Sequence, residues 1–429
     1  MKAMKAISRM KAAPRATLAA CLCLVTFAVT AAAQGDLAGG VGQFAIQPKK
    51  ERAVASARPK APTVRCGPRA TANDRLIAAA AGAGGVASVA GTLKLGADAN
   101  AKSAEGCAAL VYAVAAKNAE AAQSLLEKGA DVNSRCADGV TALMVAAEAG
   151  DEATAQALAA RGADANAKTE DGRTALMFAA SNGRLAVVRA LLAKGADVNA
   201  RYRDGRTALT FAAANGFAEV AEELVAKGAD VNARADDGWT PLLWASWFGH
   251  ADVVKLLLER GADVRARDKD RDTALMKAAT QGHAAVVKML LDKGAEADAR
   301  GNGGGTALLF AASRPAGYDV AEALLAKGAD VNARNDAGMT PTILAAAYGR
   351  VPTLEVFFSK GADVNARTPK GFTALIAAAN KGLAATAQLL IEHGADVNAK
   401  YEDGRTALSF AEQNGQTKVV EVLKAAGAK

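Results

Sequence analysis

Residues 171–199 read DGRTALMFAASNGRLAVVRALLAKGADVN, and this stretch predicts a pair of short helices. It opens with a turn, after which the hydroxyl of Thr174 can cap the start of the first helix. Gly183 ends that helix, because glycine adopts the left-handed conformation without strain. Large apolar residues at helical spacing over 187–192 predict a second helix, which Gly195 ends.

The closing Gly-Ala-Asp-Val-Asn of this stretch recurs with a nearly constant period. It begins at residues 129, 195, 228, 328, 361 and 394, with close variants at 96, 162, 261 and 294. Eight of the nine intervals are 33 residues, and the one from Gly294 to Gly328 is 34. Because the extra residue falls near Pro315, which would break a helix interior, we place it in the turn between two helices. Stacked units of this kind are expected to bury a continuous core.

The repeated unit resembles the ankyrin repeat. Residues 240–245, which read TPLLWA, and Gly249-His250 are similar to the ankyrin signature T-P-L-H-x-A followed by G-H. The resemblance covers 73–429, with a degenerate half-unit at 73–95, about ten units and a polar C-terminal cap. It implies an all-α solenoid: a curved single-layer array of stacked helix-turn-helix units with short β-turn or hairpin connections. It also implies a non-enzymatic scaffold for protein–protein interaction.

Three positions depart from the repeated pattern. Ala108 replaces the capping threonine, Lys117 replaces the inter-helix glycine, and Thr342 replaces a buried leucine. These changes affect local order and leave the predicted fold unaltered.

The first 33 residues have the layout of a secretory signal peptide. A basic segment, 1–15, precedes an apolar segment, 16–30, and three alanines then offer a cleavage site before Gln34. Fifteen apolar residues are too few to span a bilayer comfortably, so we expect no transmembrane segment in the mature chain. An uncleaved anchor is the alternative. The expected location is the bacterial periplasm or the extracellular medium.

Composition and charge narrow the class of protein further. Residues 34–72 are basic and rich in Pro, Gly and Ala, which predicts a disordered linker.

The first 72 residues carry a net charge of +10, so the other 357 carry about −2 of the total net charge of +8. A nucleic-acid-binding domain needs a concentrated basic surface, so we expect no nucleic acid partner. Aromatic residues make up only 4% of the chain, which favours thin, closely packed helices over a sheet.

A row of basic residues also follows the period. Each lies four residues after the acidic residue of the repeated motif: Lys102, Arg135, Lys168, Arg201, Arg234, Arg267, Arg300, Arg334, Arg367 and Lys400. We interpret the row as a ladder of paired turns, in which carboxylates flank each basic side chain and each exposed pair contributes roughly 0–1 kcal/mol. The alternative is that this row and the basic linker bind an anionic cell-envelope polymer.

No residue pattern indicates catalysis. The three histidines, His250, His283 and His393, lie in different units, which disfavours a metal cluster or a catalytic triad. The glycine-rich stretch 301–305 lacks the lysine of a phosphate-binding loop. We therefore expect no enzymatic activity, no cofactor and no metal.

Three cysteines remain after signal cleavage, and an exported protein can hold a disulfide. Cys107 and Cys136 lie in the turns of adjacent units, so a bond between them is conceivable. Cys66 in the linker could instead pair with Cys107. The hypothesis is one intramolecular disulfide and one free thiol.

Residues that break the repeat predict where a partner binds. Trp239, Trp247 and Phe248 lie in one unit, and we expect them to form a binding centre, with extra packing as the alternative. Trp244 belongs to a recurring aromatic stripe and is expected in the core. A lesser patch comprises Met339, Tyr348 and Phe372. Turn-tip arginines are candidates for a rim around this centre, with solvated charge as the favoured alternative: Arg173, Arg206 and Arg405. The expected partner is a protein of unknown identity, bound by a monomeric chain.

Overall fold

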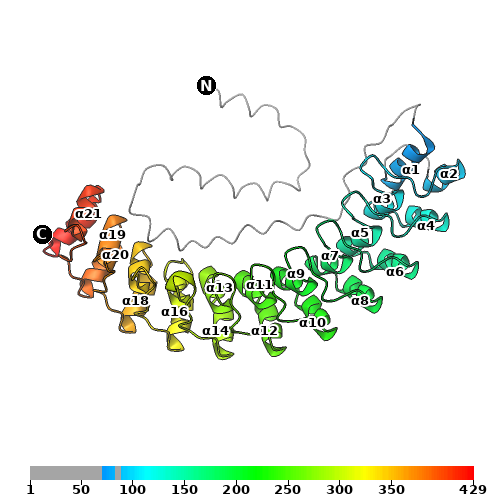
Figure 1. Ribbon diagram of the computed structural model, residues 1–429. Coiled ribbons are helices and arrows are strands. Elements are labelled where there is room, and N and C mark those ends of the chain that lie inside the picture. The colour runs from blue at the N-terminus through cyan, green and yellow to red at the C-terminus, as the bar shows by residue number, and fades with distance from the viewer. Residues whose placement is uncertain (1–69, 83–87) are drawn as a thin grey trace, which may run out of the picture. The chain divides into compact units, whose positions relative to one another are not determined.

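The computed structural model describes residues 70–82 and 88–429, and every regular element within them is helical (Figure 1). The α-helices are paired, and the first helices of successive pairs pack against one another in what we call the first-helix row. This row consists of α1 (Ala72–Ala80), α3 (Ala109–Ala115), α5 (Ala142–Ala149), α7 (Ala175–Ser181), α9 (Ala208–Asn215), α11 (Pro241–Phe248), α13 (Ala274–Gln281), α15 (Ala307–Ala312), α17 (Pro341–Ala347), α19 (Ala374–Asn380) and α21 (Ala407–Gln413).

The second helices form a parallel row, the second-helix row, against the first. It consists of α2 (Val89–Lys94), α4 (Ala119–Glu127), α6 (Glu152–Ala160), α8 (Leu185–Ala193), α10 (Ala218–Ala226), α12 (Ala251–Glu259), α14 (Ala284–Asp292), α16 (Gly317–Ala326), α18 (Val351–Ser359), α20 (Ala384–Glu392) and α22 (Thr417–Ala425). The predicted all-α solenoid of helix-turn-helix units is therefore confirmed.

The helix boundaries follow from local chemistry. Thr174 Oγ1 accepts a hydrogen bond from the Met177 amide at 3.4 Å, and α7 starts at the next residue, as predicted. Gly216 ends α9 with φ 77°, and a Cβ there would lie 2.6 Å from His250 Nδ1. Glycine is thus required at this turn both for its backbone conformation and for the close approach of the next unit.

Hairpin-like turns connect the units. An isolated antiparallel bridge joins Arg135 to Thr141 and another joins Arg267 to Thr273. The turn at Asn302–Gly304 is a short 3-10 helix, η3. These turns are the expected short hairpin connections between a second helix and the following first helix.

The irregular units behave as their sequences indicate, with one addition. The extra residue near Pro315 lies between α15 and α16, which confirms its placement in the inter-helix turn. Lys117 holds φ 55° where other units have glycine, and the N-terminus of α3 at Ala108 has no side-chain cap. The expected half-unit at 73–95 contains both helices of a unit, α1 and α2. The predicted signal peptide, Cys66 and nearly all of the predicted linker lie outside the described residues.

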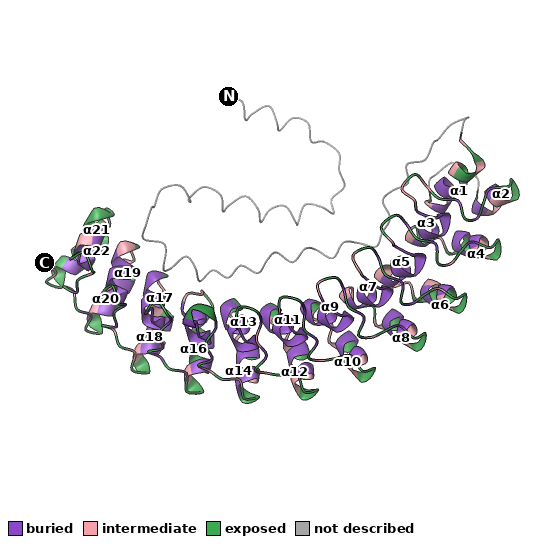
Figure 2. Cartoon of the chain, in the orientation of Figure 1, coloured by how far each residue is buried: buried purple, intermediate pink, exposed green. Residues whose placement is uncertain are grey.

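The core lies between the two rows (Figure 2). First helices are almost wholly buried, as in 175–180 of α7, where three of the six residues are alanine. Second helices bury one face only, as α8 does with Val187, Val188 and Leu191. Small side chains let three neighbouring helices approach closely, and larger ones would overpack them. Within the described residues, no helix is long and apolar enough to cross a membrane.

An asparagine ladder fixes the register of neighbouring units. Asn166 Oδ1 accepts from the Asp197 amide at 2.7 Å, and Asn166 Nδ2 donates to the Gly195 carbonyl at 3.0 Å. The same pair of bonds is made at Asn100, Asn133, Asn199, Asn232, Asn332 and Asn365. The ladder is interrupted at Arg265, whose side chain instead lies 3.8 Å from the Glu296 carboxylate.

Candidate functional site

Three positions of each unit meet at the base of its hairpin turn. They are the residue before the capping threonine, the fifth residue before that threonine and the fourth residue after it. In one unit they are Arg206, Tyr202 and Phe211. The Arg206 guanidinium lies 4.8 Å from the Phe211 ring centre and 5.4 Å from that of Tyr202, and the two rings are 6.1 Å apart. Such contacts between a cation and an aromatic face are attractive.

These contacts continue from unit to unit. Arg173 lies 5.4 Å from the ring centres of both Phe178 and Tyr202, and Arg206 lies 5.8 Å from that of Trp244. The Arg173 side chain is buried and forms an ion pair with Asp171 at 2.8 Å. The expectation that Arg173 belongs to an exposed rim is therefore wrong, because stacking between two aromatic rings draws its guanidinium into the fold.

The three tryptophans form a packed cluster. The Trp239 ring centre lies 4.5 Å from that of Trp244 and 5.9 Å from that of Trp247. The exposed fractions are 9% for Trp239, 8% for Trp244 and 5% for Trp247. Trp244 is thus in the core, as expected. Trp239 and Trp247 are also buried, so extra packing describes these two rings and the expectation of an accessible binding centre there is corrected.

Phe248 is the member of the predicted centre that reaches solvent. Its ring stacks on Trp244 with centres 6.1 Å apart and an interplanar angle of 12°, while 38% of the residue remains exposed. Trp244 in turn packs on Trp239, so the exposed ring continues a row of packed aromatic side chains. A prepositioned, exposed aromatic ring is a suitable anchor for a partner.

The three residues of the lesser patch differ in their exposure to solvent. Tyr348 is 41% exposed, whereas Met339 is buried and is corrected from a surface contact to a core residue. Met339 turns inward because it occupies the same position before the capping threonine as Trp239. Phe372 is half-buried, and its ring centre lies 6.1 Å from that of Tyr401.

The two remaining rim arginines are half-buried and already paired. Arg206 forms an ion pair with Asp204 at 3.0 Å, and Arg405 forms one with Asp403 at 2.6 Å. Hydrogen bonding by the Arg405 side chain lowers the pKa of Asp403 below its ordinary value. Their positive charges are thus largely compensated within their own turns.

A buried ionic cluster escaped the sequence-based interpretation. Lys277 Nζ lies 2.7 Å from Asp268 Oδ2 and 2.8 Å from Asp272 Oδ2, and all three side chains are almost fully buried. The ammonium also lies 4.9 Å from the Trp239 ring centre. Burial raises the pKa of Asp272 despite the opposing effect of Lys277. The signal was present, because Lys277 occupies the position that the aromatic residues Tyr112, Phe178, Phe211, Trp244, Phe310 and Phe410 hold in other units.

The basic row differs from the expected carboxylate-flanked ladder. Arg201 donates to the main-chain carbonyl of Arg234 at 2.7 Å, and Arg334 donates to that of Arg367 at 2.6 Å. Only some members reach a carboxylate, as Arg300 does with Asp336 at 3.1 Å. The expectation is corrected, because the repeat places a carbonyl of the next unit nearer than its acids for most of these arginines.

Cys107 and Cys136 form a disulfide, and both residues are buried. Cys107 directly precedes Ala108, the cap position of its unit. Cys136 lies five residues before Thr141, the cap position of the next unit. Arg173 and Tyr202 meet at the same two positions further along the chain. The bond therefore replaces a side-chain contact that other units make without covalent linkage.

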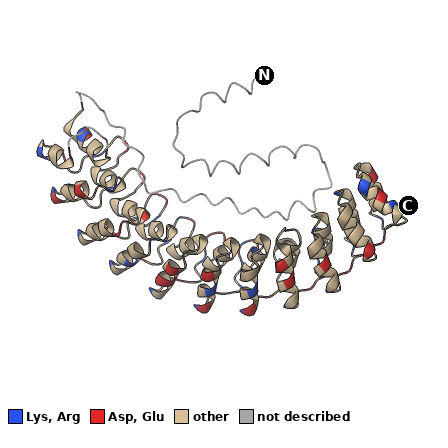
Figure 3. Ribbon diagram, turned by 180° about the vertical axis from the view of Figure 1, so that it is seen from behind, with Lys and Arg blue, Asp and Glu red and all other residues tan. Residues whose placement is uncertain are grey.

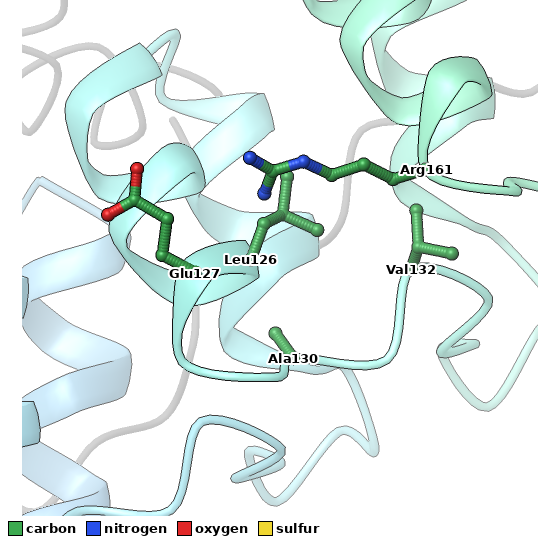
Figure 4. A pocket seen from close by; sticks show the side chains of 5 residues that line it. All are labelled: Leu126, Glu127, Ala130, Val132 and Arg161. Atoms are coloured by element: carbon green, nitrogen blue, oxygen red, sulfur yellow. The ribbon is translucent and has the colours of Figure 1, made fainter.

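The histidines and acidic residues of the described part of the chain form no metal centre. Among these residues, no group of three His, Cys, Asp or Glu side chains is placed to hold a metal ion. His250 Nε2 lies 3.0 Å from the Ala214 carbonyl oxygen, and His283 Nε2 lies 3.1 Å from that of Trp247. A surface pocket lies away from the aromatic cluster, between α4 and the end of α6 (Figure 4). Its walls are Leu126, Glu127, Ala130, Val132 and Arg161.

Comparison with protein families agrees with the geometry. A family model for ankyrin repeats in three copies matches residues 76–169, 110–202, 176–268, 265–335 and 342–429. A second model, for ankyrin repeats in many copies, matches residues 316–357. No curated protein matches the chain. Because the first model covers well over half of its length, the chain belongs to the ankyrin-repeat family and is a scaffold for protein–protein interaction.

Proposed function

We propose that the chain is an exported, non-enzymatic scaffold that binds its protein partner around Phe248. The observation that carries this proposal is the exposed Phe248 ring at the end of a buried stack that runs through Trp244 to Trp239. Because the ring already packs against Trp244, part of the entropic cost of ordering it is met before a partner binds.

The charge distribution supports the same face. Figure 3 shows Lys, Arg, Asp and Glu gathered on the second-helix row, whereas the first helices are mostly free of them. Interface cores are depleted in charged residues and enriched in aromatic ones. Helix α11, which ends at Phe248, contains no charged residue, so the exposed ring has no charged neighbour within its own helix.

The disulfide supports the proposal that the protein functions outside the cytoplasm. Such bonds form and persist in oxidising compartments and are rare in the cytosol. The bond between Cys107 and Cys136 therefore agrees with the signal peptide predicted at 1–33. Release of a mature chain that begins at Gln34 would support export, and a functional chain that retains Met1 would contradict it.

Binding of an anionic envelope polymer is the second candidate. Arg201, Arg234 and Arg334 are exposed and donate to carbonyl groups, so their positive charges are not neutralised by carboxylates among the described residues. Binding through such a row would weaken steeply as salt is added.

Affinity capture from the envelope fraction of the native host separates the candidates. The baits are the intact chain, Phe248→Ala and the control Tyr318→Ala, since Tyr318 is also 41% exposed but lies on α16 in the second-helix row. A protein held in high salt by the intact chain and the control, but lost from Phe248→Ala, is the expected result. Capture of polyanions alone, abolished by salt and equal for all three baits, would replace the protein scaffold with the polymer binder.

A further inference from the structure

We infer that a second surface on this chain binds an acidic, partly apolar peptide segment of a protein partner. The surface consists of Arg314, Tyr348, Arg350, Lys381 and Leu383, and we call it the inter-helix patch. It rests on the proposed scaffold function and adds the chemistry of the partner.

The five residues come from the inter-helix turns of three consecutive units. Arg314 follows α15, Tyr348 and Arg350 follow α17, and the remaining two follow α19. These three helices pack side by side, so their ends are neighbours. Arg350 Nε donates to the Ser313 carbonyl at 3.2 Å, which places it beside Arg314.

Apolar side chains lie among these cations. Tyr348 is 41% exposed, and it continues the position that Phe248 occupies three units earlier. Leu383 Cδ2 lies 3.3 Å from where a Cβ of Gly349 would be, so its side chain covers the glycine between Tyr348 and Arg350. The patch therefore presents an aromatic ring and an aliphatic side chain among three positively charged side chains.

The positive charges have no acidic partners of their own. In residues 70–82 and 88–429, Arg314, Arg350 and Lys381 form no ion pair. Arg314 Nε is buried without a hydrogen-bond acceptor. A carboxylate supplied by a partner would form charge-assisted hydrogen bonds with the accessible parts of these cations.

Few carboxylates lie near the patch in the chain. Helices α15, α17 and α19 contain no acidic residue, and the second helices that follow the patch residues introduce Asp319 in α16 and Glu355 in α18. Some exposed lysines elsewhere are already paired, as Lys327 is with Asp292 at 2.9 Å and Lys370 with Glu402 at 3.0 Å. The positive field of the patch therefore favours carboxylates, while its apolar side chains favour a peptide over a uniformly charged polymer.

A random library of twelve-residue peptides, selected on the intact full chain, tests the inference. We expect the retained peptides to combine Asp or Glu with aliphatic or aromatic residues. The best binder is then measured by fluorescence anisotropy against Arg314→Gln with Arg350→Gln, and against Lys255→Gln with Lys288→Gln. The control lysines are exposed on α12 and α14, so both double variants remove two positive charges.

Loss of one or both charge-assisted bonds should weaken binding to the patch variant about tenfold or more. The control variant should bind within about twofold of the intact chain, since long-range charge effects are screened. Circular dichroism of both variants confirms that the helices persist.

Two results would overturn the inference. One is selection of peptides without acidic residues, and the other is equal affinity of the acidic peptide for the patch and control variants. A polyphosphate chain that competes fully with the peptide and is lost in the patch variant would reassign the patch to polyanions. A protein that is captured in a Phe248-dependent way by the patch variant would leave the proposed function intact while the patch fails.

Discussion

The ammonium group of Lys277 lies 2.8 Å from a carboxylate oxygen of Asp272, and both side chains are almost completely withdrawn from solvent. Asp268 approaches the same ammonium group at 2.7 Å, so two carboxylates share one cation inside the array. Charges in such a place are stable only as a group, because each alone would lose its hydration without compensation.

Replacement of Lys277 by Met should therefore lower the free energy of unfolding by about 3–5 kcal/mol, as is usual when one partner of a buried ion pair is removed. The measurement is denaturant unfolding followed by circular dichroism. A loss below about 1 kcal/mol would show that water reaches the carboxylates and that they do not depend on the lysine.

The chain offers a control for this prediction in its own repeats. The equivalent positions in other units hold Ala235, Val140 and Phe310. The triple change Asp268→Ala, Asp272→Val and Lys277→Phe should recover most of the stability lost in Lys277→Met, since well-packed apolar residues often replace buried ion pairs without cost.

Repair of the asparagine ladder should stabilise the array. Arg265→Asn would restore a side chain that can bond the main chain of the next unit, as Asn232 does with Asp263 at 2.8 Å and Gly261 at 3.2 Å. We expect a gain of about 0.5–1.5 kcal/mol per hydrogen bond formed. Asn232→Ala is the matched opposite change and should destabilise the chain, as judged by the midpoints of urea unfolding.

His283, in the turn between α13 and α14, should make the stability of the fold depend on pH. Burial, and to a lesser extent His250, lower the pKa of His283 below its ordinary value of 6.5, which outweighs the bond to the Trp247 carbonyl. A lowered pKa means that the folded state binds fewer protons than the unfolded state. The neutral form of His283 therefore contributes fully to the free energy of unfolding above pH 6.5, and this contribution is lost as the pH falls below that value.

Thermal unfolding midpoints measured from pH 7.5 to 5 should therefore decrease toward low pH, and His283→Gln should reduce the decrease. His393→Gln is the control, because that histidine stacks on Phe358 in a different unit. A decrease of the same size in both variants would mean that other groups cause it.

The disulfide should stabilise the N-terminal units in particular. Cys107→Ser with Cys136→Ser opens a loop of about thirty residues, whose closure is worth about 3–4 kcal/mol. Hydrogen exchange should then increase over α3, α4 and α5 and remain unchanged over α19–α22, since repeat stability is local. An increase in exchange that is equal in all units of the double variant would contradict this expectation. Thiol counting on the denatured, unreduced mature chain should give one.

The fold could be predicted in detail because its determinants are local. The capping Thr174, the turn glycines and the 33-residue period each act within one unit or between equal units. Even the irregular turn at Pro315 could be placed, because proline is incompatible with a helix interior.

The candidate site could be predicted only in part, because its exposure depends on contacts between units. Trp239 is covered by Lys277 from the following unit, 38 positions further along the chain. Arg173 is enclosed by Tyr202 of the following unit in the same manner. A tryptophan or arginine at a turn can face solvent or turn inward, and the choice depends on which residue the next unit supplies.

The inter-unit hydrogen bonds of the asparagine ladder and of the arginine row all point the same way along the chain. Asn166 offers its side chain to the main chain of the next unit, and Arg201 does likewise toward Arg234. Each loop is thus bonded by side chains that lie earlier in the chain. These side chains are synthesised before the loop, and in an exported chain they would also cross the membrane before it. A chain that emerges from its N-terminus can therefore be assembled vectorially, because every newly exposed loop meets a finished template.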